Sequence, residues 1–332
     1  MNYNYSIFVD CGAPSLYNNL SRKSEKKGIM GSTFKERKYD DFSYVDSPEY
    51  QKYRESYIKF LHENEDKVTT YSNLDVINNP YLTWKNQMIL ESNGLHPIPV
   101  FHLGCDEKWL KKYIEKYEYI AIGGLVPNPT KVLLPWIDKI FRQYILDKDG
   151  FPQVKVHGFA CTSMPLMTKF PWYSVDSATC RKLGMYGWIV LPEYKNGKLK
   201  TVRVSSRDIP LKVRWTPGYL KEFTSRAEKL GFTLEELSND GLLRVIWNYI
   251  MFRKSLSVQV PKWPWNYYTR EVKDESENHL IFYLAGVLSK KEEEVFWKRI
   301  SDEKEMDAGK GRLQSFFYRN SLEHIIQLND NE

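Results

Sequence analysis

Three aspartates stand where predicted β-strands end, and together they could catalyse a displacement with acid–base assistance. Asp10 closes the apolar run IFVD, Asp75 follows the run TTYSNL, and Asp176 closes the run PWYSVD. The C-terminal ends of parallel strands point to one face, so the three carboxylates would share a pocket. Repulsion between neighbouring carboxylates separates their protonation, so one can stay an ionised nucleophile while another holds a proton. Displacement at a sugar C1′ requires this division of work.

Each aspartate also has a purely structural interpretation. Asp is a common helix N-cap and turn residue, so Asp176 could cap a helix and Asp10 could cap the loop that follows it. Asp75 precedes Asn78-Asn79-Pro80, which is a turn signal. The shared placement of the three residues at strand ends favours the catalytic interpretation.

Two histidines and a glycine pair occupy further strand ends. His102 in PVFHLG and His157 in VKVHGF could hydrogen-bond a base or bind a metal, although an interior histidine with a satisfied hydrogen bond is the more common case. Gly123 and Gly124, followed by Leu125, offer bare backbone at a pocket floor, or else form a tight turn. No HxH or HExxH pattern is present, so we predict no metal site. A metal-dependent hydrolase that uses the histidines and the aspartates stays open as an alternative.

The segments that would position these residues alternate between strand and helix patterns. Strands are predicted at residues 5–9, 67–74, 98–102, 119–122, 154–159, 172–175 and 188–191. Helices are predicted at residues 48–63, 81–93, 107–116, 130–146 and 179–183. Alternation of this kind indicates parallel strands joined by crossover helices. No GxGxxG opens the first crossover, so the α/β class with a (β/α)8 TIM-type barrel is predicted over an open doubly wound sheet.

The whole chain is predicted to form one domain. Residues 1–215 would hold the first seven β/α units of the barrel, with a basic loop at residues 19–46. Residues 216–332 would add a helical insertion at 217–257, the last barrel strand at 279–284 and C-terminal helices.

Composition limits the class of protein. The chain has 332 residues, of which 42% are hydrophobic and 15% aromatic, so it can bury a large core. It has no apolar run of about 20 residues and no signal peptide pattern, so a cytoplasmic protein without a membrane partner is expected. Its four cysteines form no CxxC pair, which signals neither a disulfide framework nor a thiolate zinc site. A net charge of +6 suits a polyanionic partner but is also common without one.

Two segments outside the alternation could contact nucleic acid. Residues 21–38 would form a mobile basic loop on the catalytic rim, or simply a solvated surface loop. Its candidate phosphate-binding residues are Arg22, Lys23, Lys26, Lys27, Lys35, Arg37 and Lys38. The segment KWPWNYYTR at residues 262–270 could stack bases or cover the side of the barrel.

The order of the strand-end motifs resembles that of the tRNA-guanine transglycosylases. The matching stretches are DCGAPS at 10–15, SNLDVINNP at 72–80, FHLGCDEKWL at 101–110, AIGGLVP at 121–127 and VDSATC at 175–180. The stretch HGFACTSMPLMTKFPWYSVDS is similar to phage-type relatives that insert 7-deazaguanines into DNA. The resemblance covers about residues 5–192 by motif order.

This resemblance implies a role for each aspartate. Asp176 would attack C1′ as the nucleophile and form a covalent glycosyl-enzyme, Asp10 would be the general acid and base, and Asp75 would accept hydrogen bonds from the Watson–Crick edge of the purine. The base pocket would include the backbone of Gly123, Gly124 and Leu125, with His102 and His157 beside it.

The chain also departs from the family pattern. It lacks the family's Cys-x-Cys-x2-Cys and His zinc site, has Leu103 where a base-contacting Gln is expected, and has Cys11 and Pro14 in place of commoner residues. These departures favour DNA over tRNA and predict a protein without zinc.

The predicted function is therefore the exchange of guanine for a 7-deazaguanine in nucleic acid. The free 7-deazaguanine would be the co-substrate and no other cofactor is expected. If the chain is encoded by a phage, it would act in the host cytoplasm. The incoming base, the target sequence and the oligomeric state stay open. The alternatives are a tRNA-guanine transglycosylase of the queuine type, the metal-dependent hydrolase, and a barrel that binds nucleic acid without catalysis.

Overall fold

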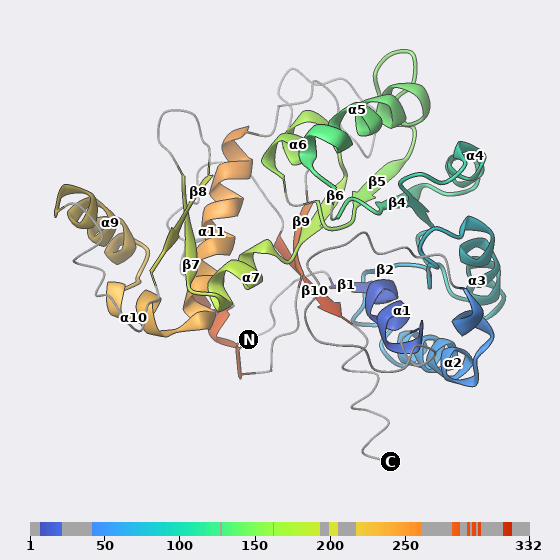
Figure 1. The fold of residues 1–332 in the computed structure, drawn as a ribbon, viewed down its shortest axis with the longest axis horizontal. Helices are drawn as coiled ribbons and strands as arrows, with labels where there is room; N and C mark the ends of the chain where they lie inside the picture. Colours follow the sequence, from blue (N-terminus) through green and yellow to red (C-terminus); the bar gives the residue numbers. More distant parts are fainter. Residues whose placement is uncertain are drawn as a thin grey trace. The chain divides into compact units, whose positions relative to one another are not determined.

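A computed structural model describes residues 7–21, 42–126, 128–161, 163–192, 199–204, 217–259, 281–285, 291–292, 294–296, 298–299 and 315–320. The chain has a mixed α/β fold with a sheet of parallel strands (Figure 1). It divides into two compact units. The sheet unit comprises Tyr5–Cys161, Trp172–Asp176 and Phe316–Glu332, and the helical unit comprises Met1–Asn4, Thr162–Pro171 and Ser177–Ser315.

The sheet unit is built from short parallel strands. Its strands are β1 (Ile7–Asp10), β2 (Thr70–Tyr71), β3 (Val100–His102), β4 (Tyr119–Gly123), β5 (Lys155–Gly158), β6 (Ser174–Ser177) and β10 (Ser315–Asn320). β1 pairs with β2 and with β10, β3 with β4, β4 with β5, and β5 with β6, in every case parallel. A further parallel bridge joins Ser72 to Ile98, between the segments that carry β2 and β3. The strands predicted from residues 5–9 to 172–175 are thus present, with ends that differ by a few residues.

Helices connect these strands, and local caps set where they begin. They are α1 (Ala13–Ser21), η1 (Ser43–Asp46), α2 (Pro48–Glu63), α3 (Pro80–Ser92), α4 (Glu107–Lys116), α5 (Thr130–Ile140) and the π-helical turn η2 (Phe141–Ile145). The side chains of Ser47, Asn79 and Asp106 accept hydrogen bonds from the first turns of α2, α3 and α4. Proline follows the first two caps at a position where no backbone donor is lost. The predicted helices at 48–63 and 107–116 are confirmed.

The core of the sheet unit explains the residue types in these elements. The strands are buried on both faces, as expected for a parallel sheet covered by helices: Phe8, Val9, Ile120 and Val156 are fully buried. The predicted helix at 130–146 is observed as α5 followed directly by η2. No helix among the described residues is long and apolar enough to span a membrane.

The helical unit contains α6 (Met164–Lys169), α7 (Thr179–Met185), β7 (Trp188–Pro192), β8 (Leu199–Arg203), α9 (Pro217–Lys229), α10 (Leu234–Asn239), α11 (Gly241–Gln259) and β9 (Ile281–Ala285). The buried α11 packs on β7, where Asn248 and Trp247 hydrogen-bond the backbone of Val190. The strand predicted at 279–284 is observed as β9.

The interpretation of residues 188–191 as a parallel barrel strand is wrong. β7 pairs antiparallel with β8 along its whole length, in a separate two-stranded sheet. Only residues 193–198 separate the two strands. A connection this short suits an antiparallel pair, whereas a parallel pair needs a crossover of about a dozen residues or more.

Candidate active site

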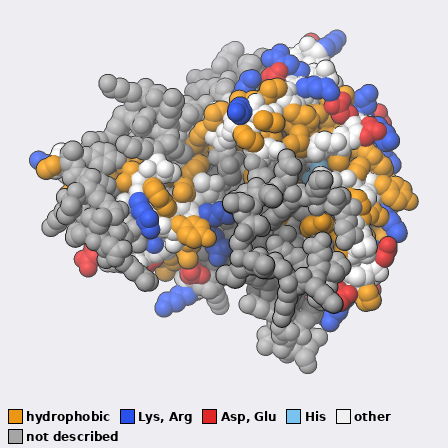
Figure 2. All heavy atoms as spheres, viewed as in Figure 1, with side chains coloured by type: hydrophobic (Ala, Val, Ile, Leu, Met, Phe, Trp, Pro, Cys, Tyr) orange, Lys and Arg blue, Asp and Glu red, His pale blue; other side chains and the backbone are white. Residues whose placement is uncertain are grey.

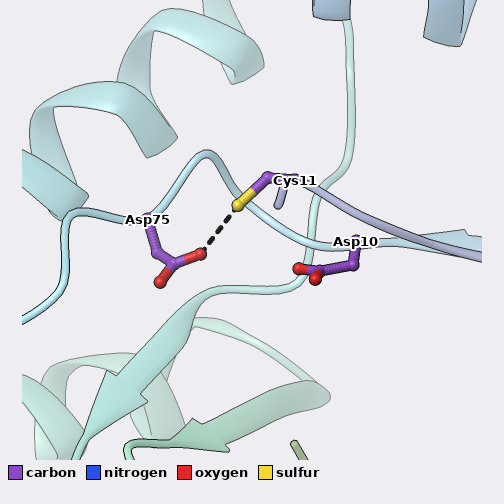
Figure 3. Close-up of side chains that lie close together, drawn as sticks. All are labelled: Asp10, Cys11 and Asp75. Carbon is purple, nitrogen blue, oxygen red and sulfur yellow. Dashed lines mark hydrogen bonds between the residues drawn. The ribbon is translucent and has the colours of Figure 1, made fainter. Parts of the chain in front are cut away.

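Asp10, Cys11 and Asp75 lie together where β1 ends and where the loop after β2 passes it (Figure 3). One ligand atom from each residue lies within 4.8 Å of the others. The side chain of Cys11 points toward Asp75, and Sγ donates a hydrogen bond of 2.8 Å to Oδ1 (Figure 3). Asp75 does not end a strand as predicted but lies in the loop after β2, which ends at Tyr71, so this loop and the end of β1, 65 residues apart in the chain (75 − 10), contribute to one cluster.

Asp75 is held from both sides of its carboxylate. Nε2 of His102, at the end of β3, lies 2.9 Å from Oδ2, and both side chains are buried. The loop that carries Asp75 is fixed by Asn86, which donates to the carbonyl of Leu74, and by Thr83, which accepts from the backbone N–H of Val76. The orientation of this carboxylate is therefore set by its surroundings.

The backbone of Cys11 is anchored as well. Its N–H donates to Oγ of Ser72 at 3.1 Å, and its carbonyl accepts from the hydroxyl of Tyr53 at 2.8 Å. The hydroxyl of Tyr57 donates to the carbonyl of Ser72. These buried hydrogen bonds connect α2 to the ends of β1 and β2, so they fix the turn after Asp10.

Asp10 is the carboxyl group that holds a proton at neutral pH. Burial raises its pKa, and the nearby carboxylates of Asp75 and Asp176 raise it further, from 3.8 to about 8. Hydrogen bonds from the backbone of Gly12 and Cys11 act in the opposite direction without offsetting the rise. The structure thus brings Asp10 within electrostatic reach of Asp176, the predicted nucleophile, and of Asp75, the predicted base-binding residue.

Asp176 lies inside β6, whereas the sequence pattern places it just after a strand. Its Oδ1 accepts a hydrogen bond of 2.7 Å from the backbone N–H of Ala160 and lies 3.4 Å from Nε2 of His157. Ala160 has φ of 50°, in the left-handed region that is uncommon for residues other than glycine. Both of these contacts fall on Oδ1, and the Asp176 side chain is buried.

His157 lies behind Asp176 and has no exposed surface. Its ring stacks on Phe8 with centroids 4.4 Å apart, and Nδ1 lies 2.6 Å from Oγ of Ser174. The same Oγ lies 2.6 Å from the hydroxyl of Tyr119. Burial lowers the pKa of His157, although the neighbouring Asp176 carboxylate acts in the opposite direction. The imidazole is therefore neutral at pH 7.

The glycine pair lies against His102. A Cβ on Gly123 would come within 2.9 Å of Cδ2 and 3.2 Å of Nε2 of His102, so only glycine leaves room for that ring. Gly124 has φ of 77°, and its carbonyl accepts from the side chain of Asn128. Leu125 is buried behind the turn. The predicted pocket backbone thus lies beside the Asp75–His102 pair.

The predicted nucleic-acid contacts lie outside the described residues. This applies to Arg22, Lys23, Lys26, Lys27, Lys35, Arg37 and Lys38, and to the aromatic segment at 262–270. On the face drawn in Figure 2, the described Lys and Arg side chains are interspersed with Asp and Glu.

Sequence reasoning missed four contributors: Cys11 as a partner of Asp75, the backbone of Ala160, and the Tyr119–Ser174 pair behind His157. Ser174 had a weak signal, because its hydroxyl is a polar group two residues before Asp176 in an otherwise apolar run. Tyr119 and Ala160 had none, since their roles depend on which strands are neighbours.

Comparisons with protein families, with characterised proteins and with solved structures found no match.

Proposed function

We propose that this protein is a transglycosylase that exchanges guanine for a 7-deazaguanine in nucleic acid through a covalent intermediate on Asp176. The observation that carries the proposal is the convergence of the carboxyl groups: those of Asp10 and Asp75 lie within 4.8 Å of each other, and they and Asp176 are close enough for the charges of Asp75 and Asp176 to raise the pKa of Asp10. A carboxyl group that is protonated at pH 7 beside a second, buried carboxylate is the arrangement that displacement at C1′ with general acid assistance requires.

The proposal includes a (β/α)8 barrel. In the sheet unit, parallel contacts join β1 to β2, the β2 segment to the β3 segment through Ser72 and Ile98, and then β3 to β4, β4 to β5 and β5 to β6. From β1 to β6, neighbours in space are thus consecutive in the chain, and β10 pairs with β1 on its other side. This order supports a barrel, because an open doubly wound sheet reverses its strand order at a switch point.

In the first step, Oδ2 of Asp176 forms a bond to C1′ as the bond from C1′ to guanine breaks. The electron pair of the broken bond goes to the guanine, and Asp10 donates its proton to the departing base. In the second step, Asp10 takes a proton from the incoming 7-deazaguanine, whose nitrogen attacks C1′ and releases the Asp176 carboxylate. Two displacements give net retention at C1′.

Asp75 would recognise the base. Each carboxylate oxygen can accept two hydrogen bonds, so the contacts from Cys11 and His102 leave Asp75 able to accept from the N–H groups of a guanine edge. His102 would then hold Asp75 in place, and the bare backbone at Gly123 would let a planar base approach. DNA is the favoured substrate because the zinc cysteines and the base-contacting Gln of the tRNA enzymes are missing from the sequence.

The test is mass spectrometry of nucleosides from DNA and from tRNA after incubation with the protein and candidate 7-deazaguanines. Exchange should occur with the wild-type protein and not with Asp176→Asn, which should still bind nucleic acid. Asp149→Asn is the matched control, since Asp149 is an exposed aspartate in the turn between η2 and β5. Turnover by Asp176→Asn would exclude the covalent mechanism. If the wild-type protein exchanged none of the bases, the alternative of a protein that binds nucleic acid without catalysis would be favoured.

A metal-dependent hydrolase is the second candidate, because Asp10, Cys11 and Asp75 have ligand atoms within 4.8 Å of one another. A thiol and two carboxylates are a plausible donor set for Zn²⁺. Burial, followed by the charges of Asp75 and Asp10, raises the pKa of Cys11, however, and its thiol donates to Asp75. We therefore expect elemental analysis of purified protein to find much less than one zinc per chain, and exchange to survive chelators. Stoichiometric metal lost together with activity would favour the hydrolase.

A further inference from the structure

Four side chains on three adjacent strands form a continuous chain of contacts that ends at Asp176. The hydroxyl of Tyr119 on β4 lies 2.6 Å from Oγ of Ser174 on β6, and this oxygen lies 2.6 Å from Nδ1 of His157 on β5. Nε2 of the same ring lies 3.4 Å from Oδ1 of Asp176, a contact that does not have hydrogen-bond geometry. Ser174, His157 and Asp176 are all buried, and the sheet register places Ser174 beside His157.

The chemistry of these groups allows one direction of hydrogen bonding. An ionised Asp176 can only accept, so Nε2 of His157 must carry the hydrogen that faces it. A neutral imidazole then has an acceptor at Nδ1, so the hydroxyl of Ser174 must donate to it. The hydrogen of Ser174 is thereby used, and Tyr119 must donate its own hydroxyl hydrogen to Oγ.

We propose that Tyr119, Ser174 and His157 are positioning residues. Tyr119 and Ser174 keep the hydrogen of His157 on Nε2, where it faces Oδ1 of Asp176, and this contact presents Oδ2 to the substrate. The role of Asp176 as the attacking group rests on the proposed function, whereas the direction of the hydrogen bonds does not.

The geometry at Asp176 explains why such positioning matters. The backbone N–H of Ala160 donates to Oδ1 at 2.7 Å, and the attraction of an Nε2–H on His157, 3.4 Å away, would add to this hold on the carboxylate. The His157 contact is long at present, and contacts of this kind commonly shorten once substrate is bound. Loss of one donor would let the carboxylate turn, and misplacement of a reacting group costs roughly 10- to 100-fold in rate.

The first experiment needs no substrate. Protein labelled with ¹⁵N-histidine should give, for His157 at pH 8, a protonated Nε2 and an unprotonated Nδ1. The signal is assigned by its loss in His157→Gln. A proton on Nδ1 at this pH would reverse the direction of the hydrogen bonds and overturn the proposal.

The second experiment measures the rate at which a covalent protein–nucleic acid adduct forms. Ser174→Ala should slow this step about 10- to 100-fold without a change in the affinity for nucleic acid, and Ser174→Thr, which keeps the hydroxyl, should restore most of the rate. Ser177→Ala is the matched control, because Ser177 is an equally buried serine on β6 whose hydroxyl accepts from Thr179.

The two experiments separate the possible failures. A purely structural role would lower the unfolding free energy of the Ser174 and Ser177 variants alike and leave both rates similar, which would overturn the proposal. If the wild-type protein forms no adduct, the proposed function is wrong. The ¹⁵N signals of His157 then still test the proposed direction of the hydrogen bonds, because they need no substrate.

Discussion

The buried thiol of Cys11 donates a 2.8 Å hydrogen bond to Oδ1 of Asp75. This contact ties the residue after Asp10 to the carboxylate that His102 holds from the other side. The sequence neighbour of Asp10, the proposed proton donor, therefore contacts Asp75, the proposed acceptor for the base.

Replacement of Cys11 should reveal what this contact contributes. Cys11→Ala leaves a buried carboxylate oxygen with one donor fewer, so the free energy of unfolding should fall by about 1–3 kcal/mol. Cys11→Ser keeps a donor of similar size and should lose less. Urea denaturation of the three proteins at pH 7 measures the difference. Equal losses in the two variants would mean that volume, and not the hydrogen bond, is what matters at this position.

The raised pKa of Asp10 predicts a pH-dependent gain in stability for Asp10→Asn. Its pKa is about 8 in the folded protein, compared with 3.8 ordinarily, so between these values the folded state binds more protons than the unfolded state. Wild-type stability should therefore fall as the pH rises from about 4 to 8. Asn cannot ionise, so Asp10→Asn should be no more stable than the wild type at pH 4. At pH 8 its free energy of unfolding should exceed that of the wild type by up to about 5 kcal/mol.

Urea denaturation at several pH values measures this gain, with Asp106→Asn as the control of opposite sign. Hydrogen bonds from the backbone and side chain of Lys108 lower the pKa of Asp106, so that variant should lose stability above pH 4 and regain it in acid. If the difference in unfolding free energy between Asp10→Asn and the wild type did not change with pH, the assignment of Asp10 as the proton donor would be contradicted.

Gly123→Ala should disturb the base pocket through His102. The new Cβ would lie 2.9 Å from Cδ2 of a ring that is held by Asp75, so the ring must move. We expect a loss of about 1–3 kcal/mol in unfolding free energy and weaker binding of guanine by calorimetry. Gly218→Ala, where nothing lies within 4 Å, is the control and should be neutral or slightly stabilising. If Gly123→Ala bound guanine as tightly as the wild type, His102 would have no role in base recognition.

Neutralising the basic segment should weaken binding to all DNA sequences alike. Each phosphate contact removed lowers the slope of log affinity against log salt by about 0.9 on duplex DNA. The test substitutes Gln at Lys26, Lys27, Lys35 and Lys38 and titrates DNA at several salt concentrations. The control substitutes four exposed lysines elsewhere, at Lys52, Lys59, Lys85 and Lys111. Equal slopes in both variants would show that the segment is simply solvated.

Local signals in the sequence predicted α2 and α4 because their caps and apolar spacing lie within a few residues of each helix. The antiparallel pairing of β7 also had a local signal: the dipeptide Asn196-Gly197 between the two strands is typical of a hairpin turn. The interpretation of 188–191 as a barrel strand gave too much weight to the alternation before it.

The contacts within the site could not be predicted in the same way. Cys11 meets Asp75 across 64 residues and Ala160 meets Asp176 across 16, and both contacts depend on strand neighbours and register. The motif order gave the position of the aspartates along the chain. The proton on Asp10 depends on distances between carboxylates, which no linear pattern contains.

The left-handed backbone of Ala160 restricts how this chain can vary in evolution. With φ of 50°, the position favours Gly or Asn and strongly disfavours β-branched residues, for which this conformation is costly. Because its N–H is the donor to Asp176, proline is excluded as well. Divergent homologues that keep the aspartate should therefore keep a small residue 16 positions before it, and this pairing offers a way to find them when overall similarity has been lost.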